Sequence, residues 1–385
     1  MVDILLRGGH VVDPLHGINS IQDVAIDGSR VLRVGQNLDA SAARQVIDAR
    51  GLIVVPGLID LHVHVHWGVS HYGIDADASC LAHGVTTAVD AGSAGAYTYP
   101  SLKRWVMDRS QTELYAFLNI AYPGMIGDQI GELEDLRTID DDLAAKVAQS
   151  SEILGIKVRL DRVGANRATL PLARAIAVAQ RVGKPVMVHI GSARRMNAPL
   201  DALLDLLRPG DIVTHMYHGK DGGLVDEQSR VRASVWDARM RGVLFDVGHG
   251  AGSFSFPVAR AALEQGFAPD VISSDLHTYS LLSPVGDLAT TLSKFMLMGM
   301  SLSEVVARAT AAPAAVIGQA ARLGHLGVGA DADITLLQHQ QGSYAYSDCD
   351  GHTEQGEQRL YPAYTIKRGS LAGLGPASAL GLLTL

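Results

Sequence analysis

Residues 58–64 read LIDLHVH, a short apolar run that ends in two histidines, His62 and His64. A run of this length and composition is typical of a buried β-strand. Side chains alternate along a strand, so both histidines are expected on one face. Similar strand-like runs recur along the middle of the chain. They lie at 85–89, 114–120, 154–159, 185–190, 211–215, 243–247 and 270–275.

Segments with helical spacing separate most of these runs, for example 168–182, 198–208 and 257–266. Strands that alternate with helices predict βα units and a parallel sheet. Eight such units within about 260 residues fit a (β/α)8 TIM barrel better than an open, doubly wound sheet, although the pattern alone permits both. We therefore predict an α/β fold built around a barrel.

The two ends of the chain contain shorter strand-like runs, broken by Gly, Pro and Asn. Gly28 and Ser29 suit a two-residue hairpin turn, because glycine tolerates the positive φ that such a turn requires. The polar stretch 340–358 is predicted to be a surface loop. The strand-like runs are 3–13, 23–27, 30–34, 44–48, 332–338 and 364–369.

The composition indicates a globular protein. The chain has 385 residues, of which 47% are hydrophobic and 19% charged. One core rarely grows beyond about 250–300 residues, so we expect one large domain and a smaller one. The net charge of −8 gives no basic surface for nucleic acid or an anionic membrane. We expect a small-molecule substrate, and neither nucleic acid nor membrane as a partner.

Two cysteines, Cys80 and Cys349, exclude a disulfide scaffold and fit a reducing compartment. The start, MVDILLRGGH, lacks the pattern of a signal peptide. A cytoplasmic location follows as a prediction. The apolar residues 371–385 are too few to span a membrane, and we expect them to pack on the body of the protein or on a partner subunit of a homo-oligomer.

Polar side chains stand at the ends of the predicted strands, where the active site of a TIM barrel lies. Each one alone has an ordinary structural explanation, such as a hydrogen-bonded core histidine, a lysine that snorkels or an aspartate that caps a helix. Their joint occurrence at strand ends indicates a functional site. These residues are His62, His64, Lys157, Arg159, His189, His215 and Asp275.

The ligand types favour a divalent metal. Imidazole nitrogens and carboxylate oxygens suit Zn²⁺, with Mn²⁺, Co²⁺ and Ni²⁺ as alternatives. Lys157 is the exception, because an ammonium group has no lone pair for a metal. A buried neutral amine could instead react with CO₂ to form a carbamate, whose two oxygens could bridge two ions.

The motif PGLIDLHVH at 56–64 resembles the amidohydrolase superfamily, and so do the flanking β segments and GADADI at 329–334. The resemblance covers essentially the whole chain. Within the superfamily the chain is similar to the deacetylase and dihydroorotase-like group, through GIKVR at 155–159, VHIG at 188–191 and SDLH at 274–277. The later residues of the motif follow in the family's order. They are Lys157, His189, His215 and Asp275.

The resemblance implies a barrel over residues 58–319 and a composite β-sandwich domain from residues 1–57 and 320–385. It also implies two divalent metal ions, the more buried one held by His62, His64 and Asp275. The more exposed one would be held by His189 and His215. Lys157, as N6-carboxylysine, would bridge the two ions together with a hydroxide.

The implied activity is that of a metal-dependent hydrolase acting on the acyl amide or ester bond of a small acylated amino or hydroxy acid. In this scheme the bridging hydroxide attacks the acyl carbonyl and Asp275 moves the proton to the leaving group. A cyclic amidase such as a dihydroorotase or hydantoinase is the alternative. A non-catalytic scaffold is a further alternative, but it would lack some of the metal ligands, whereas all six predicted metal ligands are present in this sequence.

Four residues are candidate substrate contacts. The guanidinium of Arg159 could hold a substrate carboxylate by two parallel hydrogen bonds, and a salt bridge with an acid of the barrel is its alternative role. His218, His249 and His277 lie close to strand ends, where they could contact substrate or orient ligands. Packing around the site is the alternative for each.

Overall fold

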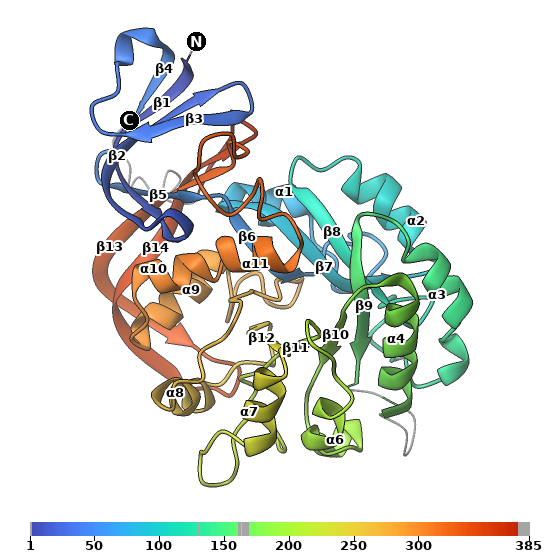
Figure 1. Cartoon of the computed structure of the whole chain (residues 1–385). Coiled ribbons are helices and arrows are strands. Elements are labelled where there is room, and N and C mark those ends of the chain that lie inside the picture. The colour runs from blue at the N-terminus through green and yellow to red at the C-terminus, as the bar shows by residue number, and fades with distance from the viewer. Residues whose placement is uncertain (1, 130, 161–162, 164–168, 376–385) are drawn as a thin grey trace.

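The computed structural model describes residues 2–129, 131–160, 163 and 169–375. Seven parallel strands from the middle of the chain form a curved sheet in which each strand pairs with its neighbours in sequence (Figure 1). The predicted packing of the apolar residues 371–385 concerns a segment of which residues 376–385 lie outside the described part of the chain. The seven strands are β6 (Leu58–Val63), β7 (Val85–Gly95), β8 (Glu113–Asn119), β9 (Ile153–Arg159), β10 (Val186–His189), β11 (Ile212–Thr214) and β12 (Leu244–Asp246).

The segment 270–275, predicted as the eighth strand, closes the barrel through isolated bridges. Val271 pairs with Asp246 of β12, and Leu276 pairs with Val63 of β6. Between these bridges the carboxylate of Asp60 accepts the backbone N–H of Ser274 at 3.0 Å, which takes the place of a ladder hydrogen bond. The prediction of a continuous strand was therefore wrong, although the parallel barrel it would complete is confirmed.

Helices cover the outer face of the curved sheet (Figure 1). The longest, α4 (Thr169–Val182), packs against β9 and β10 with an apolar face that includes Leu172, Ala175 and Ala179. In the described part of the chain, none of the helices has the length and apolar character needed to cross a membrane. The other helices are α1 (Ala76–Ser79), α2 (Tyr99–Leu102), α3 (Asp141–Val147), α5 (Ala193–Met196), α6 (Leu200–Leu204), α7 (Ala233–Met240), α8 (Phe256–Glu264), α9 (Leu288–Leu297), α10 (Leu302–Ala307) and α11 (Ala311–Val316).

Both ends of the chain contribute to a second, eight-stranded sheet (Figure 1). The two ends meet where β13 pairs antiparallel with β5, with Ile334 opposite Pro56. The predicted hairpin turn at Gly28 is confirmed, since Asp27 pairs with Arg30 and Gly28 has a φ of 54°. The strands are β1 (Val2–Asp13), β2 (Ile18–Asp27), β3 (Arg30–Gly35), β4 (Ala43–Asp48), β5 (Leu52–Pro56), β13 (Ile334–Ser347), β14 (Thr353–Lys367) and β15 (Ser370–Leu374).

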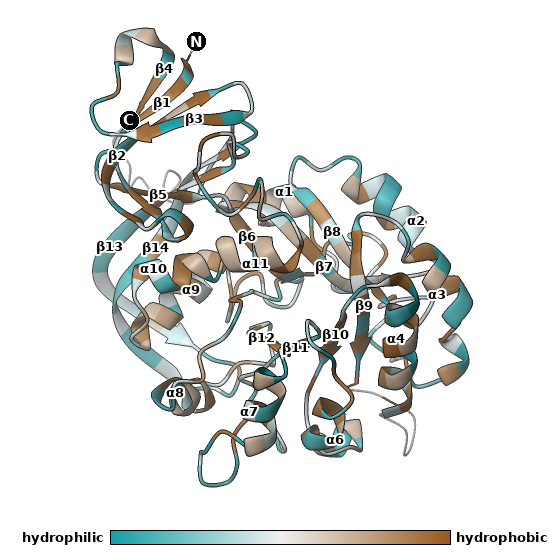
Figure 2. Ribbon diagram, viewed as in Figure 1, coloured by the Kyte–Doolittle hydropathy of each residue, from teal (hydrophilic) through white to brown (hydrophobic). Residues whose placement is uncertain are grey.

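The stretch 340–358 is not the predicted loop but part of a long hairpin formed by β13 and β14. The hairpin is largely polar, as its teal and pale colours show (Figure 2), so its hydropathy did not indicate a strand. Contacts with the barrel stabilise it, because α9 packs on β14 and Ser293 Oγ accepts the backbone N–H of Leu360 at 3.0 Å. Tertiary packing, which a local pattern does not reveal, explains the difference.

Candidate metal centre

The six predicted metal ligands converge at the C-terminal ends of the barrel strands. All of them are buried except His189, which is partly exposed. Five of them line a cavity of about 390 Å³, while His62 lies behind it. The five are His64, Lys157, His189, His215 and Asp275.

The carboxylate of Asp275 is at the centre of this group. Its Oδ1 lies 3.4 Å from His62 Nε2 and 3.2 Å from His64 Nε2. Lys157 Nζ lies 3.3 Å from His62 Nε2. His62, His215 and Asp275 also present one ligand atom each within 4.8 Å of one another. The three elements β6, β11 and the 270–275 segment thus bring their ligands to one point.

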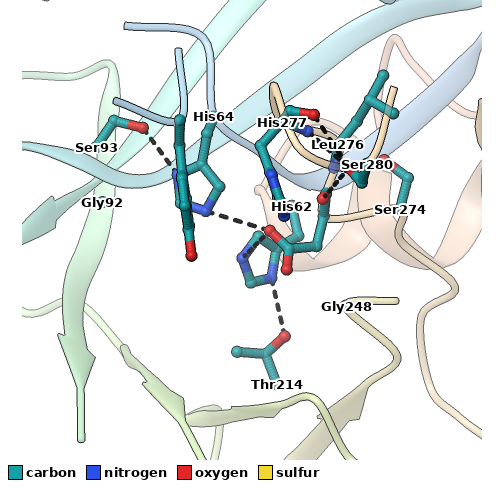
Figure 3. Close-up of polar contacts among 12 residues, drawn as sticks. His62, His64, Gly92, Ser93, Thr214, Gly248, Ser274, Leu276, His277 and Ser280 are labelled. Atoms are coloured by element: carbon teal, nitrogen blue, oxygen red, sulfur yellow. Dashed lines mark hydrogen bonds and ion pairs between the residues drawn. The ribbon is translucent and has the colours of Figure 1, made fainter. Parts of the chain in front are cut away.

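Hydrogen bonds to the Nδ1 atoms determine which imidazole nitrogen faces this point. Thr214 Oγ1 donates to Asp246 at 2.7 Å, so its oxygen accepts the Nδ1 proton of His62 at 2.9 Å (Figure 3). His215 Nδ1 donates to the carbonyl of Gly248 at 2.7 Å. With the proton on Nδ1, the lone pair of both rings is on Nε2. The lone pairs therefore face the centre of the site.

His64 is held in the same way, with its Nδ1 2.8 Å from Ser93 Oγ (Figure 3). Within the described residues, the buried Nε2 atoms of His189 and His215 and Oδ1 of Asp275 have no hydrogen-bond partner. Buried acceptors without a partner are costly, and their mutual repulsion adds to that cost unless a cation lies among them. Neutral imidazoles with a carboxylate form the donor set that Zn²⁺ and similar ions take, so these residues fit a metal.

Burial sets the protonation of the ligands. It lowers the pKa of His62, His189 and His215 well below the ordinary range, and that of His64 to about 3. The imidazoles are therefore neutral at physiological pH, as metal ligands must be. Burial also lowers the pKa of the Lys157 amine to about 8, which makes its neutral, nucleophilic form accessible.

Two glycines leave room for these side chains. Gly92 in β7 has a φ of 92°, and a Cβ at this position would lie 2.5 Å from Lys157 Cγ. Gly250, with a φ of 54°, lies so close to Asp275 that a Cβ would overlap its Oδ2. The backbone after β12 therefore packs directly against the predicted ligands.

Comparison with known proteins places this site in a family. A model of the amidohydrolase family matches residues 230–369. A deacetylase of Brucella anthropi is 35% identical over 347 residues, which cover 89% of this chain and 85% of that protein.

The chain belongs to the amidohydrolase family.

Solved structures of relatives agree with this membership over nearly the full chain. The crystal structure of an adenine deaminase has a TM-score of 0.88 at 32% identity and covers 96% of this amidohydrolase and 99% of that chain. The crystal structure of a dihydroorotase has a TM-score of 0.87 at 33% identity, covering 96% and 98%. The chain is thus a hydrolase of the deacetylase and dihydroorotase-like group, as its sequence motifs imply.

Of the four predicted substrate contacts of this amidohydrolase, Arg159 and His277 line the cavity. Arg159 lines the cavity, but its Nε and Nη2 pair with the carboxylate of Glu132 at 2.8 and 3.1 Å. This is the salt bridge that the sequence left open as its alternative role. His277 lines the cavity and stacks on Tyr72, with ring centroids 4.4 Å apart.

His218 and His249 are not among the described residues that line the cavity. The ring of His249 is fully buried against Phe254, and its Nε2 lies 2.7 Å from Lys294 Nζ. His218 Nδ1 accepts the backbone N–H of Lys220 at 3.2 Å. Direct substrate contact by these two residues therefore stays a prediction, and neither ring belongs to the described lining of the cavity.

Seven further residues line the cavity without having been predicted as site residues, namely Tyr72, Asp128, Lys220, Ala251, Gly252, Ser253 and Tyr279. They belong to loops, where no strand alternation indicates the direction of a side chain. Only the position of these loops directly after predicted strands could have pointed to them.

The contact between Ser93 and His64 leads to a first prediction. Ser93→Ala should weaken metal binding by about 10- to 100-fold, because it removes the group that orients the His64 ring. Metal affinity is measured by competition with a chelator. Ser110→Ala is the matched control, since Ser110 Oγ donates to the carbonyl of Val106, away from the site. Equal affinity in wild type and Ser93→Ala would refute the prediction.

Proposed function

We propose that this amidohydrolase removes the acyl group from a small acylated amino or hydroxy acid. The observation that carries the proposal is the convergence of neutral imidazole Nε2 atoms and the Asp275 carboxylate on one cavity. The Brucella anthropi relative, named a deacetylase, supports the type of bond. A cavity of about 390 Å³ fits a small molecule. A cytoplasmic homo-oligomer stays our prediction for its location and assembly.

The same residues indicate how metal would be held. We assign one divalent ion, preferably Zn²⁺, to His62, His64 and Asp275, and a second to His189 and His215. A carboxylated Lys157 would lie between them, and Gly92 leaves room for its side chain. When bound, such ions polarise an acyl carbonyl and lower the pKa of water.

The residues of the chain then perform the proton transfer and the positioning. Asp275 has one oxygen directed at His62 and His64, and its carboxylate borders the cavity. It can accept the proton of the attacking water and pass it to the leaving nitrogen or oxygen. Tyr72 and the stacked ring of His277 form an aromatic wall of the same cavity, against which a substrate could pack.

Metal content provides a second prediction. The purified protein should carry about two divalent ions per chain, because six ligands suffice for two sites. Elemental analysis measures this directly. Chelation should lower the unfolding temperature, because bound metal stabilises the folded state. Active enzyme with only traces of metal would contradict the proposal.

The substrate is tested with acylated amino and hydroxy acids of both hands, together with cyclic amides. Release of acetate from the acyl acids supports the proposal. Ring opening without acetate release would favour the alternative, a cyclic amidase, which the likeness to the dihydroorotase structure supports. Because both activities are measured on the same metal-loaded preparation, the ratio of their rates distinguishes them.

A further inference from the structure

Lys220 lines the cavity from the loop between β11 and α7. Within the described part of the chain, its ammonium group has neither an ion-pair nor a hydrogen-bond partner. Arg159, the other cation of the lining outside the ligand group, is paired with Glu132 through two hydrogen bonds. The two cations therefore differ, since among the described residues Arg159 has an ion-pair partner and Lys220 has none.

The loop that carries Lys220 is held in place by contacts on several sides. The backbone N–H of Lys220 donates to His218 Nδ1 at 3.2 Å. The carbonyl of Asp221 accepts the N–H of Ala193 at 3.0 Å, which ties the loop to the start of α5. Gly219 packs so closely on Asp350 that a Cβ would overlap the carboxylate. A fixed loop presents the ammonium group at a low entropic cost of binding.

The charges around the cavity indicate the kind of ligand. Apart from the predicted metal ligands, the charged residues of the described lining are Asp128, Arg159 and Lys220. Asp128 is 79% exposed at the rim, and the charge of Arg159 is balanced by Glu132. One unbalanced positive charge beside the ligand group suits a ligand with one negative charge.

We propose that Lys220 binds the carboxylate of the acyl acid and thereby selects acids over neutral substrates. The inference rests on the proposed function, which provides a substrate with one carboxylate next to the scissile bond. An ammonium–carboxylate pair forms a charge-assisted hydrogen bond, stronger than the bond to a neutral amide. His218 is then a positioning residue, since it acts on Lys220 through the backbone.

Lys220 lies within electrostatic reach of the predicted ligands. Lys220 lines the same cavity as Asp275 and His215. A carboxylate held by Lys220 is thus close to the reacting centre, as an acyl acid requires.

The test uses metal-loaded full-length protein with N-acetylalanine and its primary amide, N-acetylalaninamide. Lys220→Met should lower kcat/KM for the acid about 10- to 100-fold, mainly through KM, and change that for the amide less than about threefold. Lys220→Arg should restore part of the loss, because it keeps the charge. Lys146→Met, at an exposed position of α3, is the control and should leave both substrates unaffected.

A binding measurement separates this inference from the proposed function. Lactate and lactamide have no acyl bond, so their affinity for the loaded protein is measured without turnover. Lys220→Met should weaken lactate binding about 10-fold or more and leave lactamide binding unchanged. If wild type hydrolyses no acyl acid, the proposed function fails, while lactate binding still tests Lys220.

Equal losses for acid and amide in Lys220→Met, or no loss for the acid, would overturn the inference. Arg159→Met is the informative comparison, because its ion pair with Glu132 predicts equal effects on both substrates. An acid-selective loss in Arg159→Met, with none in Lys220→Met, would assign the carboxylate to Arg159 instead.

Discussion

Lys157→Ala is expected to lose bound metal and at least ~10²-fold of kcat, because it removes the group proposed to lie between the two ions. The side chain is buried, and its Nζ lies 3.3 Å from His62 Nε2. An ammonium group at this position would repel a cation, whereas a carbamate would attract it. Activity and metal content, measured on the same samples, should therefore fall together.

Lys157→Arg should not rescue the loss. A guanidinium group stays protonated and cannot react with CO₂, so the variant keeps the positive charge and lacks the carbamate. Full activity and full metal content in Lys157→Ala would refute the carbamate. A high-resolution electron-density map that shows a bare amine would refute it as well.

The pH dependence of reconstitution provides a further check on Lys157. Only the neutral amine reacts with CO₂, and burial lowers its pKa to about 8. Metal-free protein given metal and bicarbonate should therefore recover activity faster as the pH rises toward 8. Below that value, the neutral fraction falls about tenfold per pH unit. Recovery that does not depend on bicarbonate would contradict the prediction.

The barrel was predictable because its strands are short apolar runs that alternate with helical segments. Their order also placed His62, His189 and His215 at one end of a parallel sheet, where the structure brings them together. A local pattern suffices here, since the C-terminal ends of parallel strands necessarily share one edge. The ligand group therefore follows from positions along the chain.

Other features depend on contacts between distant segments. The strand expected at 270–275 is interrupted because Asp60, more than two hundred residues earlier, accepts a backbone N–H that a ladder bond would use. The hairpin of β13 and β14 is polar and is held by α9. Lys220 lies on a loop, and only the neighbouring side chains show that its ammonium group has no ion-pair partner among the described residues, while the charge of Arg159 is balanced by Glu132. Sequence patterns carry no information on such pairs.

Asp275→Asn is expected to lower kcat at least ~10²-fold at saturating metal, the usual scale for general acid–base catalysis. Asparagine has a similar shape and still offers one oxygen to a metal, but it cannot accept a proton. In wild type the ionised carboxylate is the active form, so activity should be lost on the acid side. Burial raises the pKa of Asp275 to about 6. A bound cation would lower this pKa, so the loss of activity on the acid side of the pH–rate profile should occur below this value.

The leaving group distinguishes proton transfer from ligation. A nitrophenyl ester hardly needs protonation of its leaving group, so Asp275→Asn should lose much less activity on it than on an amide. If Asp275 served only as a metal ligand, the substitution would act through loss of metal. Excess metal would then restore the activity on both substrates to the same extent. Kinetics of Asp275→Asn on this matched pair, over a titration with metal, therefore decide the role of the carboxylate. If Asp275→Asn lowered kcat by the same factor for ester and amide at saturating metal, Asp275 would be excluded as the proton carrier. A loss confined to the amide would establish that role.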